Sequence, residues 1–189
     1  MKKHSMNMIF AIVISIVTIL LLNYCSSRRK AVQKVQLPEP VAVTDSVFIG
    51  AEVNDGKHYG TAVINSSLAG YEPKGAYPWE CSVCIYIENM TDDRLPVESE
   101  FEPLYKTEDK IDSLVNGDLK PVNAIYVGHT LIDGTMLCLW RVRDAEAAYK
   151  AITEFSNSEK YLRPFSYVIE HDPQWERTSV LYKGIGLEL

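Results

Sequence analysis

The chain has 189 residues, of which 47% are hydrophobic and 23% are charged, and its formal net charge is −6. This composition is typical of a globular protein and allows one domain with its own hydrophobic core. The acidic balance argues against nucleic-acid binding, because contacts to phosphates need a basic surface.

Residues 8–24 form an uncharged apolar run, and basic residues flank it on both sides. A helix of this length just spans the hydrocarbon core of a membrane. We therefore predict an uncleaved N-terminal membrane anchor. Two alternatives stay open, a cleaved signal peptide and a lipoprotein acylated at Cys25.

The chain divides into an N-terminal membrane anchor or signal segment (residues 1–27), an extended linker (residues 28–44) and a soluble domain (residues 45–189). Positive charge is slightly greater on the C-terminal side of the anchor, which favours a cytoplasmic domain. The domain contains three cysteines, and an odd number suits a reducing compartment better than an oxidising one.

Strand patterns begin at residue 47. Residues 47–64 predict a β-hairpin that turns at Asp55-Gly56. Residues 79–87 alternate apolar and polar side chains, which predicts a half-buried strand. Its core face is expected to hold Cys81, Val83 and Ile85, and its opposite face Cys84 and Tyr86.

Two helices are predicted beyond this strand. The first begins at Ser99, which forms a capping box with Glu102, and ends at Asn116-Gly117. The second begins at Asp144. Its buried face is expected to consist of Ala145, Ala148, Tyr149, Ile152 and Phe155. A hairpin over residues 122–142 separates the two helices, and residues 165–170 form the last strand.

The order strand, helix, strand, strand, helix, strand over residues 79–170 is the split βαβ, or ferredoxin-like, pattern. We predict an α+β fold in which a transmembrane helix precedes an antiparallel sheet, with two helices on one face and an extra N-terminal β-hairpin. The strand at 135–142 is apolar on both faces and should be central. The hairpin at 47–64 is expected to cover part of the other face.

Short motifs recur in a characteristic order along the domain. They are Asn-Ser-Ser-Leu-Ala-Gly-Tyr at 65–71, Tyr-Pro-Trp at 77–79, Leu-Pro at 95–96, Tyr-Val-Gly at 126–128, Arg-Pro-Phe at 163–165 and Asp-Pro-x-Trp at 172–175. Over residues 47–183 this order resembles a bacterial family catalogued as domain of unknown function 695. Some members look like the regulator of ribonuclease E activity B, a protein that inhibits an enzyme by binding it, so the resemblance implies a binding role. The anchor and His129 depart from the family pattern, which has a basic residue at the latter position.

The sequence gives little sign of catalytic chemistry. Cys81 and Cys84 form a CxxC pair, but side chains three apart in a strand point to opposite faces, so we interpret both as structural thiols. The four histidines lack metal-ligand spacing, so we predict no metal and no cofactor. The first helix carries a group of acidic residues that we interpret as a solvated face or a docking surface for a basic partner. The group consists of Glu98, Glu100, Glu102, Glu108 and Asp109.

We predict a membrane-anchored module that binds or regulates a protein partner without catalysis. The candidate partner-binding residues are Glu98, Glu102, Asp109, His129, Arg163, Asp172 and Trp175. For the last three, the alternative is a purely structural corner of the fold. The alternative function is a small hydrolase or ligand-binding enzyme that uses His129 with Asp133 or Asp172.

Overall fold

The computed structural model describes residues 36–43, 45–54, 56–118, 121–158, 160–187 and 189. The chain divides into two compact units, residues 1–37 and residues 38–189, and the elements below belong to the second. The strands are β1 (Phe48–Asn54), β2 (Tyr59–Asn65), β3 (Trp79–Tyr86), β4 (Ala124–Ile132), β5 (Thr135–Val142) and β6 (Phe165–His171). The helices are α2 (Phe101–Asn116), α3 (Ala145–Asn157) and α4 (Glu176–Gly184), with short 3-10 helices η1 (Ser66–Leu68), η2 (Lys74–Ala76) and η3 (Glu98–Glu100).

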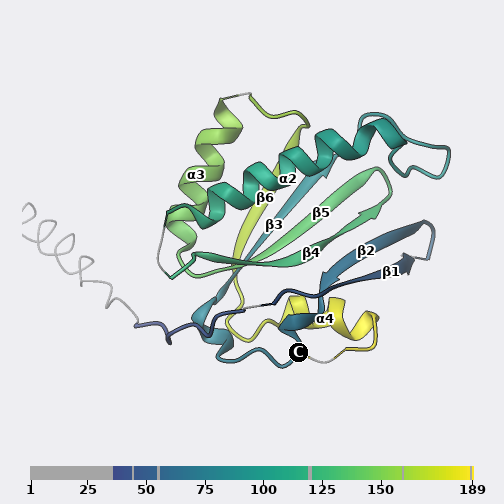
Figure 1. Ribbon diagram of the computed structural model, residues 1–189. Helices are drawn as coiled ribbons and strands as arrows, with labels where there is room; N and C mark the ends of the chain where they lie inside the picture. Colours follow the sequence, from purple (N-terminus) through teal and green to yellow (C-terminus); the bar gives the residue numbers. More distant parts are fainter. Residues whose placement is uncertain (1–35, 44, 55, 119–120, 159, 188) are drawn as a thin grey trace, which may run out of the picture. The chain divides into compact units, whose positions relative to one another are not determined.

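In the described part of the chain, six strands form one antiparallel sheet in the order β1-β2-β4-β5-β3-β6 (Figure 1). Helices α2 and α3 cover one face, and α4 packs against the other. The fold is therefore of the predicted α+β class, and the order strand, helix, strand, strand, helix, strand runs from β3 to β6. Strand β5 lies between β4 and β3, as expected for a strand that is apolar on both faces.

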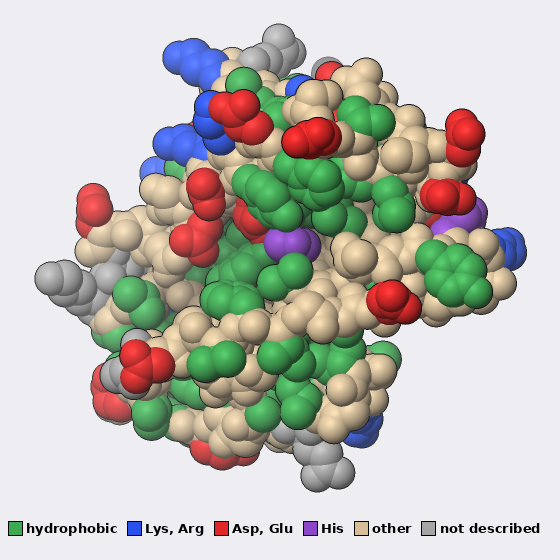
Figure 2. Space-filling model, turned by 45° about the vertical axis from the view of Figure 1, so that its right-hand side comes forward, with side chains coloured by type: hydrophobic (Ala, Val, Ile, Leu, Met, Phe, Trp, Pro, Cys, Tyr) green, Lys and Arg blue, Asp and Glu red, His purple; other side chains and the backbone are tan. Residues whose placement is uncertain are grey.

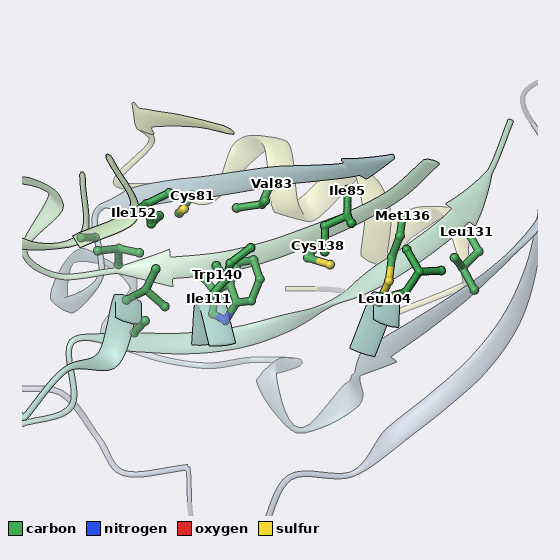
Figure 3. Close-up of a cluster of buried hydrophobic side chains, with 14 of the residues drawn as sticks. Cys81, Val83, Ile85, Leu104, Ile111, Leu131, Met136, Cys138, Trp140 and Ile152 are labelled. Carbon is green, nitrogen blue, oxygen red and sulfur yellow. The ribbon is translucent and has the colours of Figure 1, made fainter. Parts of the chain in front are cut away.

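The first hydrophobic core lies between the sheet and helices α2 and α3. Cys81, Val83 and Ile85 of β3 are fully buried in it, which confirms the predicted alternation. Figure 3 shows these side chains beside those of β5, with Leu104 and Ile111 of α2 in the same cluster. Burying an aliphatic side chain of this size contributes about 1.5–3 kcal/mol, so this layer is a large source of stability.

The second core lies on the opposite face, where α4 and the chain between β2 and β3 cover the sheet. Trp175 and Tyr182 are fully buried there. The β1–β2 hairpin does not cover this face, contrary to the expectation. Strand β2 instead forms backbone hydrogen bonds with β4, and the paired residues run from Thr61 and Leu131 to Ile64 and Gly128. The hairpin therefore widens the sheet. Helix α4, which is absent from the sequence prediction, supplies the cover.

The end of the first helix and the start of the second agree with the prediction. Helix α2 ends at Asn116, and Gly117 follows with a positive φ of 52°. The side chain of Asp144 accepts a hydrogen bond from the backbone N–H of Ala147 and so caps α3.

Two details of the helices were predicted wrongly. Ser99 does not cap α2, because η3 precedes the helix and α2 begins only at Phe101. Tyr149 is 56% exposed rather than buried under α3. Its ring lies 5.8 Å from that of Tyr167 on edge strand β6, where no further element follows in the described sheet.

Residues 38–43 run along the body before β1. Arg143 donates a hydrogen bond to the carbonyl of Pro38 (2.6 Å), and the hydroxyl of Tyr71 donates to that of Val41 (3.0 Å). The predicted anchor, residues 8–24, lies outside the described residues. Within the described ranges, no helix combines the length and apolar character that crossing a membrane requires.

Candidate functional site

A bulge in β4 sets the geometry of the site. Tyr126 pairs with Trp140 of β5, and Gly128 pairs with Leu139, so two residues of β4 advance against one of β5. Gly128 has a φ of +145°, and a Cβ at this position would lie 2.1 Å from the carbonyl oxygen of Val63. Only glycine fits such a backbone, which explains why the bulge occurs here.

The bulge changes which side chains face helix α2. Side chains alternate along a regular strand, so Tyr126 and His129, three residues apart, would point to opposite faces. The extra residue of the bulge shifts the alternation by one, so both side chains lie on the same face and contact Glu108 of α2. The structure therefore assembles a buried group, Tyr126, His129 and Glu108, that regular alternation along β4 would not bring together.

The three side chains share hydrogen bonds. Nδ1 of His129 lies 3.1 Å from Oε1 of Glu108, and the hydroxyl of Tyr126 lies 2.8 Å from the same nitrogen. The Tyr126 hydroxyl also donates to Oε1 of Glu108. When Nδ1 of His129 carries the proton, the His129 imidazole and the Tyr126 hydroxyl both donate to Oε1 of Glu108. That tautomer leaves the lone pair of the imidazole on Nε2.

Burial at this site changes the pKa of two groups, Tyr126 and Cys138. Burial raises the pKa of Tyr126 well above its usual range, and the charge of Glu108, which accepts its hydrogen bond, adds to this effect. Burial, followed by the charge of Glu108, raises the pKa of the Cys138 thiol in the same way. Both groups therefore stay protonated at neutral pH. Cys138 is a poor nucleophile in this setting, because the thiolate is the reactive form.

Nε2 of His129 is buried and has no hydrogen-bond partner among the described residues. A carboxylate that holds Nδ1 fixes the orientation of the ring, and such pairs occur in catalytic and metal-binding histidines. The described residues hold no group of three or more His, Cys, Asp or Glu side chains that could bind a metal. The arrangement can orient an imidazole rigidly, and it presents no activated nucleophile beside it.

Aromatic side chains surround this buried group at the surface. Tyr105 of α2 lies 5.8 Å from the His129 ring, and Phe48 of β1 lies 5.9 Å from the ring of Tyr126. Tyr105 stacks in turn on Phe101. We call Phe48, Phe101, Tyr105, Tyr126 and His129 the aromatic face. Figure 2 shows one face of the molecule, on which hydrophobic side chains gather around a histidine with acidic side chains close by.

Asp172 and Trp175, two predicted partner-binding residues, lie elsewhere and are buried. Asp172 binds Arg141 (3.1 Å) and caps α4 by accepting from the backbone N–H of Glu176 (2.9 Å). Trp175 is fully buried, and the Arg141 guanidinium lies 5.0 Å from the centre of its ring. The guanidinium of Arg141 also binds Glu80. This arrangement holds α4 on the sheet and leaves little of either predicted residue for a partner.

Arg163 lies at the other end of β6. Its guanidinium binds both carboxylate oxygens of the buried Glu100, each at 2.8 Å, and lies 3.4 Å from Glu88. The hydrogen bonds from Arg163 are the main reason why the pKa of Glu100 falls to about 2. Strand β6 separates this ion pair from Asp172, so the structure does not bring Arg163 and Asp172 into one site.

The acidic group of the first helix is only partly solvated. Glu98, Glu102 and Asp109 are exposed, and Glu102 pairs with Lys106 one turn away. Glu100 and Glu108, in contrast, are buried and pair with Arg163 and His129. The interpretation of all five as one solvated face was therefore wrong for these two.

The enzyme hypothesis paired His129 with Asp133 or Asp172, and the structure pairs it with neither. Asp133 pairs with Arg94, and Asp172 pairs with Arg141, whereas His129 pairs with Glu108. Patterns in the sequence did not indicate Glu108 and Tyr126 as partners of His129, because they did not predict the bulge that brings Tyr126 and His129 to one face. The available signal was Gly128, since a glycine inside a strand pattern often marks a bulge.

Comparison with known protein families identifies the family of this chain. A family model described as "Family of unknown function (DUF695)" matches residues 50–182. This range contains the whole sheet except the first residues of β1, together with α2, α3 and most of α4. No curated protein and no solved structure matches the chain.

Proposed function

The chain belongs to this family of unknown function (DUF695), since the match spans well over half of its length, and we propose that its folded body is a non-catalytic protein-binding module. The proposal goes beyond the family, whose function is itself unknown. It rests on the surface that the body exposes around His129.

The observation that carries the proposal is the exposure of two aromatic side chains over a rigid, buried base. Phe48 is 44% exposed and Tyr105 is 38% exposed, and they come from different elements, β1 and α2. Between them lie Tyr126 and His129, which Glu108 holds in place. Exposed aromatic residues on a preorganised base are typical of binding hot spots, because little entropy is lost when a partner packs on them.

The charges at the rim of this surface favour a partner with basic groups. Glu102 and Asp109 are exposed on α2, where Lys106 offsets part of the charge of Glu102, and Glu52 is exposed on β1. Exposed charges of one sign speed the encounter with a partner of the opposite sign, and salt weakens this effect. The predicted role of Glu102 and Asp109 is thus retained as steering, with the aromatic face as the contact itself.

We propose further that residues 8–24 anchor this module in a membrane. The uncharged run and its basic flanks support the proposal. A regulatory role would then consist of holding a bound partner at the membrane surface. Full-length protein that resists carbonate extraction and begins at or near Met1 would support the anchor. An N-terminus at Arg28, or an acylated Cys25, would contradict it.

The binding function is tested by photocrosslinking in the cell that makes the protein. The full chain carries the photoreactive residue p-benzoylphenylalanine in place of Phe48 or of Tyr105. The matched control carries it in place of Tyr149, which is more exposed than either but lies on α3. We expect one crosslinked protein at positions 48 and 105 and none at position 149.

Equal crosslinking at all three positions, or none at positions 48 and 105, would contradict a binding role for the aromatic face. The enzyme alternative has its own test. Turnover of a generic esterase, phosphatase or peptidase substrate that disappears in His129→Ala would overturn the proposal in favour of catalysis.

A further inference from the structure

One glycine of the sheet is not explained by the fold. Gly128 is required by its positive φ and by the close approach of Val63. Gly50, in the middle of β1, pairs regularly with Val63 and shows no positive φ. No atom of the described structure lies within 4 Å of the position that a Gly50 Cβ would occupy, so a side chain would fit there. Glycine weakens a strand, and where neither bend nor bulge needs it, it often marks the close approach of a ligand or another backbone.

The missing side chain leaves a notch in the aromatic face. Phe48, Gly50 and Glu52 point to the same side of β1, because side chains alternate along a strand. Gly50 lies opposite Val63 of β2, which lies opposite His129 of β4. The notch is therefore bounded by Phe48 and Glu52 on its own strand and by Val63 on β2, beyond which lies His129.

Strand β1 is also an edge of the described sheet. It pairs with β2 on one side, and its other side has no strand in the sheet order. An edge strand presents unpaired N–H and C=O groups that can pair with an added strand. Its seven residues contain no proline and one charged residue, Glu52, so little in the sequence blocks such pairing.

We propose that β1 binds an extended segment of a partner protein, which adds to the sheet as a seventh strand. An apolar side chain of the segment fills the notch over Gly50, and a basic side chain two residues away pairs with Glu52. This inference rests on the proposed binding function and names the class of partner. Backbone hydrogen bonds to β1 supply affinity, and the notch and the acid select the sequence.

The experiment maps crosslinks from the full-length protein in its own cell. The photoreactive residue is placed at position 48 or at position 54, at the two ends of β1 and on the same face. Paired strands keep a constant register, so the two crosslinked sites should lie about six residues apart in one linear segment of the partner. The segment should contain an apolar residue near its middle and a basic residue two positions away from it.

Two variants then test the notch and the acid. Gly50→Val should strengthen β1, since valine favours strands, and yet should reduce the crosslink at position 48 at least tenfold. Glu52→Lys should reduce it similarly. The control is Ser166→Val, a comparable change at an exposed position of the opposite edge strand β6, which should leave the crosslink unchanged.

The outcomes separate this inference from the proposed function. Crosslinks at positions 48 and 105 that persist in Gly50→Val, or that map to segments far apart in the partner, overturn the added strand and leave the binding module standing. A crosslink only to a second copy of the chain overturns the partner class. Absence of any crosslink at positions 48 and 105 overturns both.

Discussion

His129 and Glu108 lie on different elements and 21 residues apart, yet Nδ1 of the histidine is 3.1 Å from Oε1 of the glutamate. Both side chains are almost completely buried. The pair joins strand β4 to helix α2 directly beneath the exposed aromatic residues Phe48 and Tyr105. It thereby gives the aromatic face a fixed base. We expect the loss of either side chain to lower the free energy of unfolding, whether or not the protein catalyses a reaction.

The first prediction concerns this pair. Glu108→Ala leaves the Tyr126 hydroxyl and the His129 imidazole without their shared acceptor, which should lower the free energy of unfolding by about 1–3 kcal/mol. His129→Ala should cost a similar amount, and the double variant should cost less than the sum of the two. Urea denaturation of the full-length protein measures all three. Strict additivity would show that the two side chains do not interact.

The second prediction compares two glycines that lie close together in the sheet. Gly128→Ala places a Cβ 2.1 Å from the Val63 carbonyl oxygen at a positive φ, so it should destabilise the fold by more than about 2 kcal/mol. Gly50→Ala meets no neighbour and should be neutral or stabilising by up to about 1 kcal/mol. Thermal unfolding of the two variants provides the comparison. Similar losses in both would contradict the bulge geometry.

The third prediction concerns pH. The pKa of Glu100 is lowered from 4.5 to about 2, chiefly by hydrogen bonds from Arg163. A carboxyl whose pKa falls on folding stabilises the protein above its ordinary pKa and loses this contribution as pH drops toward the folded value. Glu100→Gln should therefore cost about 1.5–3 kcal/mol at pH 7, the range for hydrogen bonds to charged groups, and the cost should shrink between pH 4.5 and pH 2.

Unfolding curves at several pH values measure this effect. Glu102→Gln is the matched control, because Glu102 is exposed and pairs with Lys106 one turn away on its own helix. It should change stability little at any pH. A cost for Glu100→Gln that is the same at pH 3 and pH 7 would argue against the ion pair with Arg163.

The fourth prediction concerns the thiols. Burial raises the pKa of Cys81 to about 12, and Cys81 and Cys138 are both fully buried. Cys84 is partly exposed on the opposite face of β3. In a Cys25→Ser background, a maleimide at pH 8 should label Cys84 at least tenfold faster than the other two. Fast labelling of Cys81, or a disulfide between Cys81 and Cys84, would contradict the strand assignment.

Much of the fold follows from local patterns in the sequence. Alternation in β3 placed Cys81 and Cys84 on opposite faces, and Asp144 and Gly117 marked helix ends by their capping chemistry. The side chains of the first core follow from the same periodicities. Such features depend on neighbours within a few residues, which is the range that a sequence pattern describes.

The candidate site depends on contacts that no local pattern describes. Helical periodicity puts Glu108 on the apolar stripe of α2, four residues after Leu104 and three before Ile111, but no local pattern predicts that it meets His129 of β4. His129 faces α2 because of the bulge at Gly128, and alternation alone predicts the wrong face. Helix α4 likewise covers the second face because Asp172 binds Arg141, a buried strand residue that lies 31 positions earlier in the chain.

Hydrogen exchange of the full-length protein, with and without the partner captured at position 48, shows whether the aromatic face and strand β1 form the binding surface. If they do, amide exchange should be slower in residues 48–54 and 101–108 when the partner is bound, and unchanged in residues 145–157 and 165–171. Protection confined to α3 and β6, or unchanged exchange throughout β1, would contradict this binding surface.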